Sequence, residues 1–154
     1  VKTKLDCQVL LFGGPEDAEV VERLSERCGG AAVNIAGKFN LRELPAAIGR
    51  CQVFVTNDSG PMHIAVARKV PTVALFCATT PDLGFYPYSG NAIVIEKPLG
   101  CRPCTSHGGR RCPLLHENCI RQIRPQTVLV AVEKLLAGEA RGDKGRFLPE
   151  FLAA

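Results

Sequence analysis

Short apolar runs of strand length alternate along the chain with stretches of helical period. The apolar runs show no alternation of polar residues, which is typical of strands buried on both faces of a parallel sheet. Strands are predicted at residues 7–12, 32–35, 52–56, 72–76 and 92–95, and helices at about 16–28, 40–49, 61–69 and 125–138. The alternation predicts a doubly wound (Rossmann-like) α/β fold with helices on both faces of a mostly parallel sheet.

The length of 154 residues, with 46% hydrophobic and 22% charged residues, fits one folded domain and excludes a disordered or collagen-like chain. We expect one domain over residues 1–138, with a cysteine-rich loop at 96–124, and a C-terminal tail at 139–154. No apolar run approaches the ~18 residues of a membrane-spanning helix, and the first residues lack the apolar region of a signal peptide. The expected location is therefore the cytoplasm.

The net charge of +4 is concentrated between residues 101 and 124. This segment holds one glutamate and five arginines: Arg102, Arg110, Arg111, Arg121 and Arg124. It could meet phosphate or an anionic membrane surface, or it could be a solvated basic loop. Because no aromatic residues are interleaved with the arginines, nucleic acid is not the expected partner.

The eight cysteines fall into two groups. Four of them stand singly in apolar contexts and are expected to be small buried core residues: Cys7, Cys28, Cys51 and Cys77. Four crowd into the cysteine-rich loop: Cys101, Cys104, Cys112 and Cys119. The first two have the spacing of a metal knuckle, but six residues separate the last two. We expect reduced thiols that staple the loop without metal; a zinc site, with His107 or His116 as a substitute ligand, is the alternative.

Three loops that follow predicted strands are the candidate ligand sites, because ligands of such sheets bind beyond the carboxyl ends of the strands. Residues 12–17 join two glycines to Asp17, whose carboxylate could contact a ligand or only stabilise a helix dipole. Residues 56–63 run from a strand into a helix with Pro61 in its first turn, so its amides, Gly60 and the Ser59 hydroxyl could hold a pyrophosphate. Asp58 could instead be only the helix N-cap.

The third candidate loop carries Thr79 and Thr80 before a proline turn, where both hydroxyls could donate to phosphate or to sugar hydroxyls. His63, in the second loop, could be a ligand or only a first-turn residue packed on the sheet. Phe39 could flank a base or could be only a hydrophobic staple before a cap at Asn40.

In their order, these segments resemble the C-terminal half of glycosyltransferase family 9, the ADP-heptose:lipopolysaccharide heptosyltransferases, especially those of the heptosyltransferase II type. The motifs that carry the resemblance are Leu11-Phe12-Gly13-Gly14-Pro15-Glu16-Asp17, Gly37-Lys38-Phe39-Asn40-Leu41 with Glu43-Leu44, Asn57 to His63, Pro71-Thr72-Val73-Ala74-Leu75-Phe76, and Cys101-Arg102-Pro103-Cys104 with Cys112-Pro113 and Cys119. Where this family usually has Gly-Pro-Thr-Asp-Pro, the chain has Cys77-Ala78-Thr79-Thr80-Pro81, so a carboxylate is replaced by Thr80.

The resemblance implies a GT-B fold in which this half binds an ADP-heptose donor. An N-terminal half would bind the lipid-linked acceptor of the lipopolysaccharide inner core and supply the catalytic base, so this fragment alone is expected to be inactive. The implied reaction is an inverting transfer that needs no metal or cofactor, carried out in the cytoplasm with peripheral contact to the inner membrane.

The resemblance, together with the loop chemistry, assigns roles to individual residues. Ser59, Gly60 and His63 would hold the pyrophosphate side of the donor. Asp58 would accept hydroxyls of the donor sugar, Asp17 would reach the ribose or adenine, and Phe39 would flank the adenine.

Two other classes of function fit parts of the sequence. One is a non-catalytic nucleotide-binding module that uses residues 58–63, and the other is a zinc-stapled interaction domain that uses residues 101–119.

The central first strand of a doubly wound sheet also has no counterpart in the sequence. We expect the strands on either side of the gap to pair directly, or residues 1–5 or a partner chain to fill the position.

Overall fold

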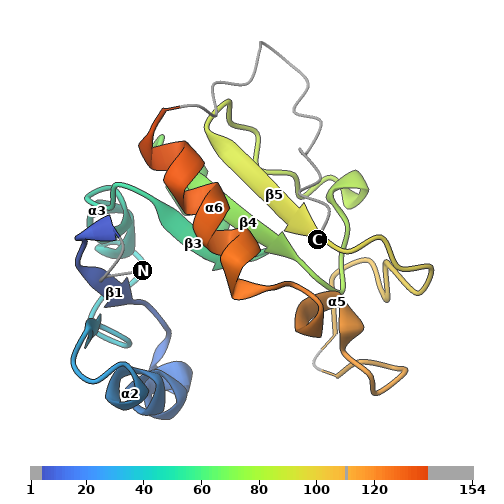
Figure 1. Ribbon diagram of the computed structural model, residues 1–154, viewed down its shortest axis with the longest axis horizontal. Helices are drawn as coiled ribbons and strands as arrows, with labels where there is room; N and C mark the ends of the chain where they lie inside the picture. The colour runs from blue at the N-terminus through green and yellow to red at the C-terminus, as the bar shows by residue number, and fades with distance from the viewer. Residues whose placement is uncertain (1–4, 110, 139–154) are drawn as a thin grey trace. The chain divides into compact units, whose positions relative to one another are not determined.

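The computed structural model describes residues 5–109 and 111–138 (Figure 1). Its residues group into two units, which divide between Ala47 and Ile48. The predicted tail at 139–154 lies outside the described residues, as do residues 1–4. No helix in the described part of the chain is long and apolar enough to cross a membrane.

The first unit is built around two short parallel strands, β1 (Val9–Leu11) and β2 (Ala32–Asn34). A short 3-10 helix, η1 (Pro15–Asp17), and helix α2 (Ala18–Arg27) connect them, because a parallel pair requires a crossover. Helix α3 (Leu44–Ile48) follows a turn, in which the Asn40 side chain accepts from the amides of Arg42 and Glu43 at 2.9 and 3.1 Å. Asn40 therefore caps this turn, and the helix predicted at 40–49 is confined to residues 44–48.

The second unit contains a three-stranded parallel sheet in the order β3-β4-β5. Its elements are, in chain order, β3 (Phe54–Asn57), α4 (Gly60–Ala67), β4 (Thr72–Phe76), η2 (Pro81–Leu83), β5 (Ala92–Glu96), α5 (Asn118–Arg121) and α6 (Pro125–Leu136). Helix α6 contacts β4 and β5 and lies across the sheet in Figure 1, while α4 contacts β3 and β4.

Strand β4 forms the centre of this unit. Side chains that alternate between its two faces are buried, including Val73 and Ala74 at 0% exposure, so both faces of the strand are covered. On one face Phe76 packs with Ala74, Met62 from α4 and Val94 from β5, and Tyr86 packs against this cluster. The rarity of polar residues in β4 and β5 is thus explained by burial on both sides.

The α/β class and the parallel pairing predicted from the sequence are confirmed. The first predicted helix is instead η1 followed by α2, and the predicted strand at 52–56 begins two residues later. The expectation that all four isolated cysteines are buried is wrong for Cys28, which is exposed at the end of α2, while Cys7, Cys51 and Cys77 are half-buried.

The predicted gap lies beside the strand at 7–12 and either the strand at 52–56 or the strand at 72–76, which correspond to β1, β3 and β4. Within the described residues, β1 pairs with β2 in the first unit and β3 pairs with β4 in the second. Direct pairing of the strands beside the gap stays a prediction. Of the segment suggested to fill the gap, residues 1–4 lie outside the described residues, and filling by a partner chain stays a prediction.

Replacing Phe76 with alanine should destabilise the second unit by about 3–5 kcal/mol, because a fully buried ring would be lost from a packed cluster. Urea unfolding followed by circular dichroism measures the loss. Leu41→Ala is the control: that side chain is 82% exposed, and its truncation should change the free energy of unfolding by less than about 0.5 kcal/mol. Equal effects of the two substitutions would contradict the assigned core.

Candidate functional site

The loops that follow β3 and β4 meet at the carboxyl edge of the sheet. Asn57 lies opposite Leu75 in the register, and the amide of Asp58 donates to the Leu75 carbonyl at 3.2 Å. The buried Thr79 then donates its hydroxyl to Oδ2 of Asp58 at 2.6 Å. Two residues that are 21 positions apart in the sequence are thereby joined at the predicted site.

Helix α4 begins at Gly60, two residues after Asp58. Its N-cap is Ser59, with φ −161° and ψ 168°, so the alternative that Asp58 is only the N-cap is wrong. The Ser59 hydroxyl makes no capping bond and donates instead to the Asn57 carbonyl at 3.2 Å. The first turn of α4 therefore has no side-chain cap from Ser59, which leaves its positive end facing this edge of the sheet.

Gly13 and Gly60 differ in what a side chain would meet at each position. A Cβ at Gly13 would lie 2.9 Å from the Cβ of Asp17 and 3.2 Å from Val21, so packing inside the first unit requires glycine there. A Cβ at Gly60 would meet no described atom within 4 Å, and the backbone there has no positive φ. Neither packing nor conformation of the described chain explains Gly60, which together with His63 is exposed.

Asp17 and Phe39 belong to the first unit, and each has a local partner. The Gly14 amide donates to Oδ2 of Asp17 at 2.9 Å, as in a capping box. The ring of Phe39 stacks on that of Phe12 with 6.4 Å between centroids, and its side chain remains 39% exposed. The structure thus joins Asp58 to Thr79 and places Thr80 next to them, before η2, but describes Asp17 and Phe39 only within their own unit.

The most heavily bonded side chain near the site is Arg102, which the sequence placed only in a basic loop. Its side chain is 3% exposed and lies beside the Glu96 carboxylate, with 2.9 Å between Nη2 and Oε2. It also donates to four backbone carbonyls: those of Phe76, Cys77, Thr79 and Lys97. The interpretation of residues 101–124 as a solvated basic loop is therefore wrong at Arg102. Only its place inside Cys101-Arg102-Pro103-Cys104 distinguished it in the sequence.

The thiols of Cys77 and of the cysteine-rich loop are free, and they differ in acidity. Burial raises the pKa of Cys77 to about 11, with a further contribution from Cys119. Burial followed by the neighbouring thiols of Cys101 and Cys112 raises the pKa of Cys104. The pKa of Cys112 is lowered, chiefly because the backbone N–H of Glu117 hydrogen-bonds to its sulfur.

The two histidines of the loop have different partners. The Asn118 amide donates to Nδ1 of His116 at 3.0 Å, so in the neutral ring Nε2 carries the proton and faces Cys101 Sγ at 4.0 Å. The His107 ring packs edge-on against Phe85. In the described part of the chain, no group of three or more His, Cys, Asp or Glu residues is arranged to hold a metal ion.

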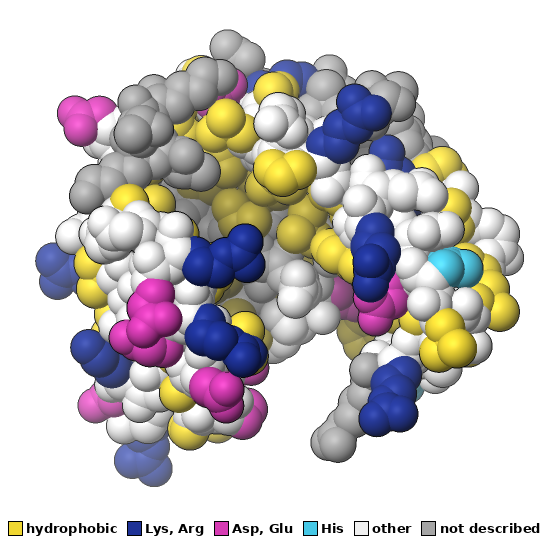
Figure 2. Space-filling view, turned by 60° about the horizontal axis from the view of Figure 1, so that its bottom comes forward, with side chains coloured by type: hydrophobic (Ala, Val, Ile, Leu, Met, Phe, Trp, Pro, Cys, Tyr) yellow, Lys and Arg dark blue, Asp and Glu magenta, His cyan; other side chains and the backbone are white. Residues whose placement is uncertain are grey.

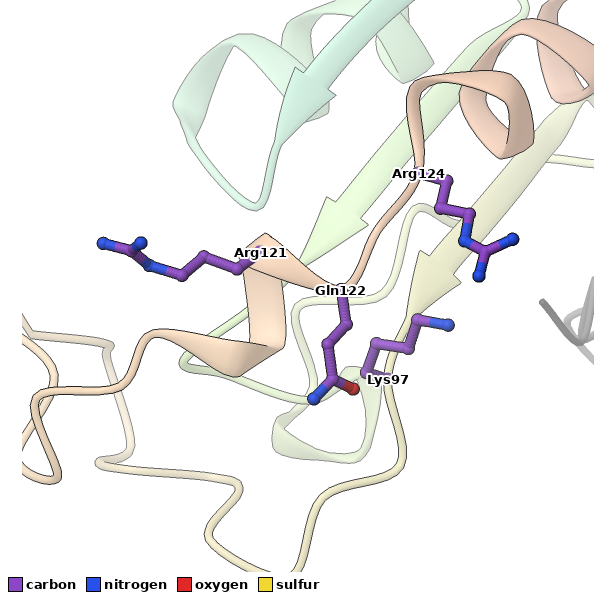
Figure 3. Close-up of a pocket in the computed structure, with 4 residues that line it drawn as sticks. All are labelled: Lys97, Arg121, Gln122 and Arg124. Carbon is purple, nitrogen blue, oxygen red and sulfur yellow. The ribbon is translucent and has the colours of Figure 1, made fainter.

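A basic pocket of about 320 Å³ lies near the end of β5, lined by Lys97, Arg121, Gln122 and Arg124. In Figure 3 the Lys97 and Arg124 side chains extend to the same side, while the Arg121 guanidinium extends away and pairs with Glu117 at 3.0 Å. On the face drawn in Figure 2, Lys and Arg side chains are interspersed with acidic and uncharged ones and form no continuous basic patch.

Limited alkylation should separate the thiols by their acidity, because the thiolate is the reactive form. At pH 8, iodoacetamide should modify Cys112 early and Cys77 last, and modification of Cys77 should accelerate as the pH approaches its pKa of about 11. Peptide mass spectrometry of a time course measures this order, and the urea-unfolded chain, in which all thiols should react alike, is the control. Modification of Cys77 as fast as Cys112 in the folded chain would contradict the assigned environments.

The chain is similar in sequence and in structure to heptosyltransferases of other bacteria. The chain is 31% identical over 132 residues to lipooligosaccharide heptosyltransferase 2 of Campylobacter jejuni, a match that covers 83% of this chain and 41% of that protein. Among solved structures, E. coli ADP-heptose LPS heptosyltransferase II superposes with a TM-score of 0.70 at 34% identity, covering 90% of this chain and 39% of that one.

A second solved structure, a family 9 glycosyltransferase from Veillonella parvula, gives a TM-score of 0.71 at 32% identity over 88% of this chain and 38% of its own. The chain thus spans about two fifths of the length of these relatives. Residues 2–114 match the family described as "Glycosyltransferase family 9 (heptosyltransferase)". The match covers most of the sequence and includes the loops of the candidate site, so this chain belongs to glycosyltransferase family 9.

Proposed function

We propose that this chain is the donor-binding part of a heptosyltransferase that transfers heptose from ADP-heptose to the lipopolysaccharide inner core. The observation that carries the proposal is the hydrogen bond of Thr79 to Asp58 beside the open start of α4, in a chain of this family. Binding of the acceptor and the catalytic base would belong to an N-terminal half. The chain spans about two fifths of the length of its relatives. Its lipid-linked acceptor would bring the enzyme to the cytoplasmic surface of the inner membrane.

The start of α4 is the proposed position of the pyrophosphate. The positive end of the helix dipole attracts an anion there, and the space in front of Gly60 lets phosphate oxygens approach the backbone amides. The exposed His63 would add a side-chain donor, and Ser59 would add another when its hydroxyl turns from the Asn57 carbonyl to the ligand. Because this arrangement can stabilise the negative charge that develops on departing ADP, an inverting transfer by this route does not require a divalent cation.

Asp58 is proposed to bind the donor sugar. A carboxylate accepts at about four positions on its two oxygens, and the Thr79 hydroxyl takes one of them on Oδ2. Sugar hydroxyls are matched donors for the remaining positions. Thr79 therefore orients the carboxylate, and the neighbouring Thr80 supplies a hydroxyl where family members usually carry an aspartate.

The adenosine end is assigned to the first unit. Asp17 uses Oδ2 to hold the Gly14 amide, which leaves its second oxygen for a ribose hydroxyl. The Phe39 ring stacks on Phe12, and Phe39 is 39% exposed. The exposed part of the ring can therefore stack on the adenine base.

The proposal predicts that Gly60→Val and Asp58→Ala each weaken ADP-heptose binding, and that Gly60→Val also weakens binding of ADP alone. A branched side chain in front of the α4 amides would block a phosphate, and the cost of a lost charged hydrogen bond is about 1–3 kcal/mol, or roughly 5- to 150-fold in affinity. Isothermal titration calorimetry of the purified chain measures both ligands.

Gly100→Val is the matched control, because a Cβ at Gly100 also meets no described atom within 4 Å. Its ADP affinity should equal that of the unmodified chain. Unchanged ADP affinity in Gly60→Val, with a circular dichroism spectrum like that of the unmodified chain, would exclude the start of α4 as the pyrophosphate site.

A further inference from the structure

We propose that Arg102 is a positioning residue of the donor site, which fixes the loop after β4 so that the Thr79 hydroxyl meets Asp58. The inference rests on the proposed function, because it assigns Asp58 and Thr79 to the donor. Arg102 itself does not contact the proposed ligand. It acts through the backbone of residues 76–79.

The first observation is the set of carbonyls that this loop presents. Four consecutive carbonyls, those of residues 76–79, accept hydrogen bonds from the segment Arg102 to Cys104. Arg102 Nη2 donates to Phe76 at 3.1 Å and to Thr79 at 2.7 Å, and its Nε donates to Cys77. The Cys104 amide donates to Ala78 at 2.7 Å. Beyond the strand pairing of β4, the carbonyls of this loop thus accept their hydrogen bonds from the cysteine-rich segment.

The chemistry of the guanidinium explains why arginine stands here. Arginine offers five N–H donors in a rigid planar fork, whereas lysine offers three donors around one nitrogen on a flexible stem. Only the fork can hold several carbonyls of the loop and the Glu96 carboxylate at the same time. Glu96, the last residue of β5, balances the charge of a side chain that is 3% exposed.

The second observation is the continuity from Arg102 to the site. Thr79 forms both bonds. Its carbonyl accepts from Arg102 Nη2 at 2.7 Å, and its hydroxyl donates to Asp58 at 2.6 Å. Gly108 lies against the same residue, since a Cβ there would be 3.7 Å from Thr79 Cγ2. A shift of the Thr79 backbone would therefore move the hydroxyl that orients the Asp58 carboxylate.

Arg102→Lys tests the role while keeping the charge beside Glu96. We expect ADP-heptose affinity to fall about tenfold, which corresponds to about 1.4 kcal/mol, and the amides of residues 77–80 to exchange hydrogen faster without ligand. In a Thr79→Val background the same substitution should lower affinity less than twofold, because the bond through which it acts is already absent. Calorimetry and amide exchange by mass spectrometry provide the two readouts.

Arg23→Lys is the matched control, because Arg23 also pairs with a glutamate, at 3.3 Å, but on the exposed surface of α2. It should change neither readout. Unchanged affinity and exchange in Arg102→Lys would overturn the inference, and so would a tenfold loss that persists in full in the Thr79→Val background.

A measurement that keeps Arg102 in place covers the case in which Arg102→Lys fails to fold. The Nε–H resonance of Arg102 should exchange slowly with water and should shift in Thr79→Val; a rapidly exchanging resonance that is insensitive to this substitution would overturn the inference. The proposed function fails separately, if the unmodified chain does not bind ADP-heptose.

Discussion

Burial of β4 is the constraint on which the second unit depends. The strand pairs in parallel with β3 and β5, and side chains on both of its faces are buried, so its direction and its end point are fixed. A parallel strand fixed in this way delivers the loop after Phe76 to the same edge at which β3 delivers Asp58. The position of the candidate site is therefore a consequence of core packing, and the loops only supply its chemistry.

The backbone carbonyls at the end of β4 and in the loop after it need hydrogen-bond donors from outside the sheet. Where the ladder ends, the carbonyls of four residues need donors, and water would satisfy them without fixing their position. The buried fork of Arg102 and the Cys104 amide satisfy them with a fixed geometry, at the cost of burying a charge that needs Glu96. The cysteine-rich segment thus supports the site through its backbone and one arginine.

The sequence predicted what depends on local pattern and failed where contacts are distant. Residues 72–76 form a strand as predicted, because an uninterrupted apolar run has no alternative to burial on both faces. The burial of Arg102 was not predictable, since its partners include Phe76 and Cys77, 26 and 25 residues away, and the segment around it reads only as basic. The prediction that Cys28 is buried failed because its neighbours are Glu26, Arg27 and two glycines, which are charged or small and provide no apolar context.

Amide chemical shifts on titration with ADP test most directly whether a nucleoside diphosphate binds at the start of α4. Titration of ¹⁵N-labelled protein should move the resonances of Gly60 and His63 most, together with those of Thr79 and Thr80, in proportion to saturation. A titration in which the largest shifts fall on the basic pocket of residues 97 and 121–124 would contradict the account.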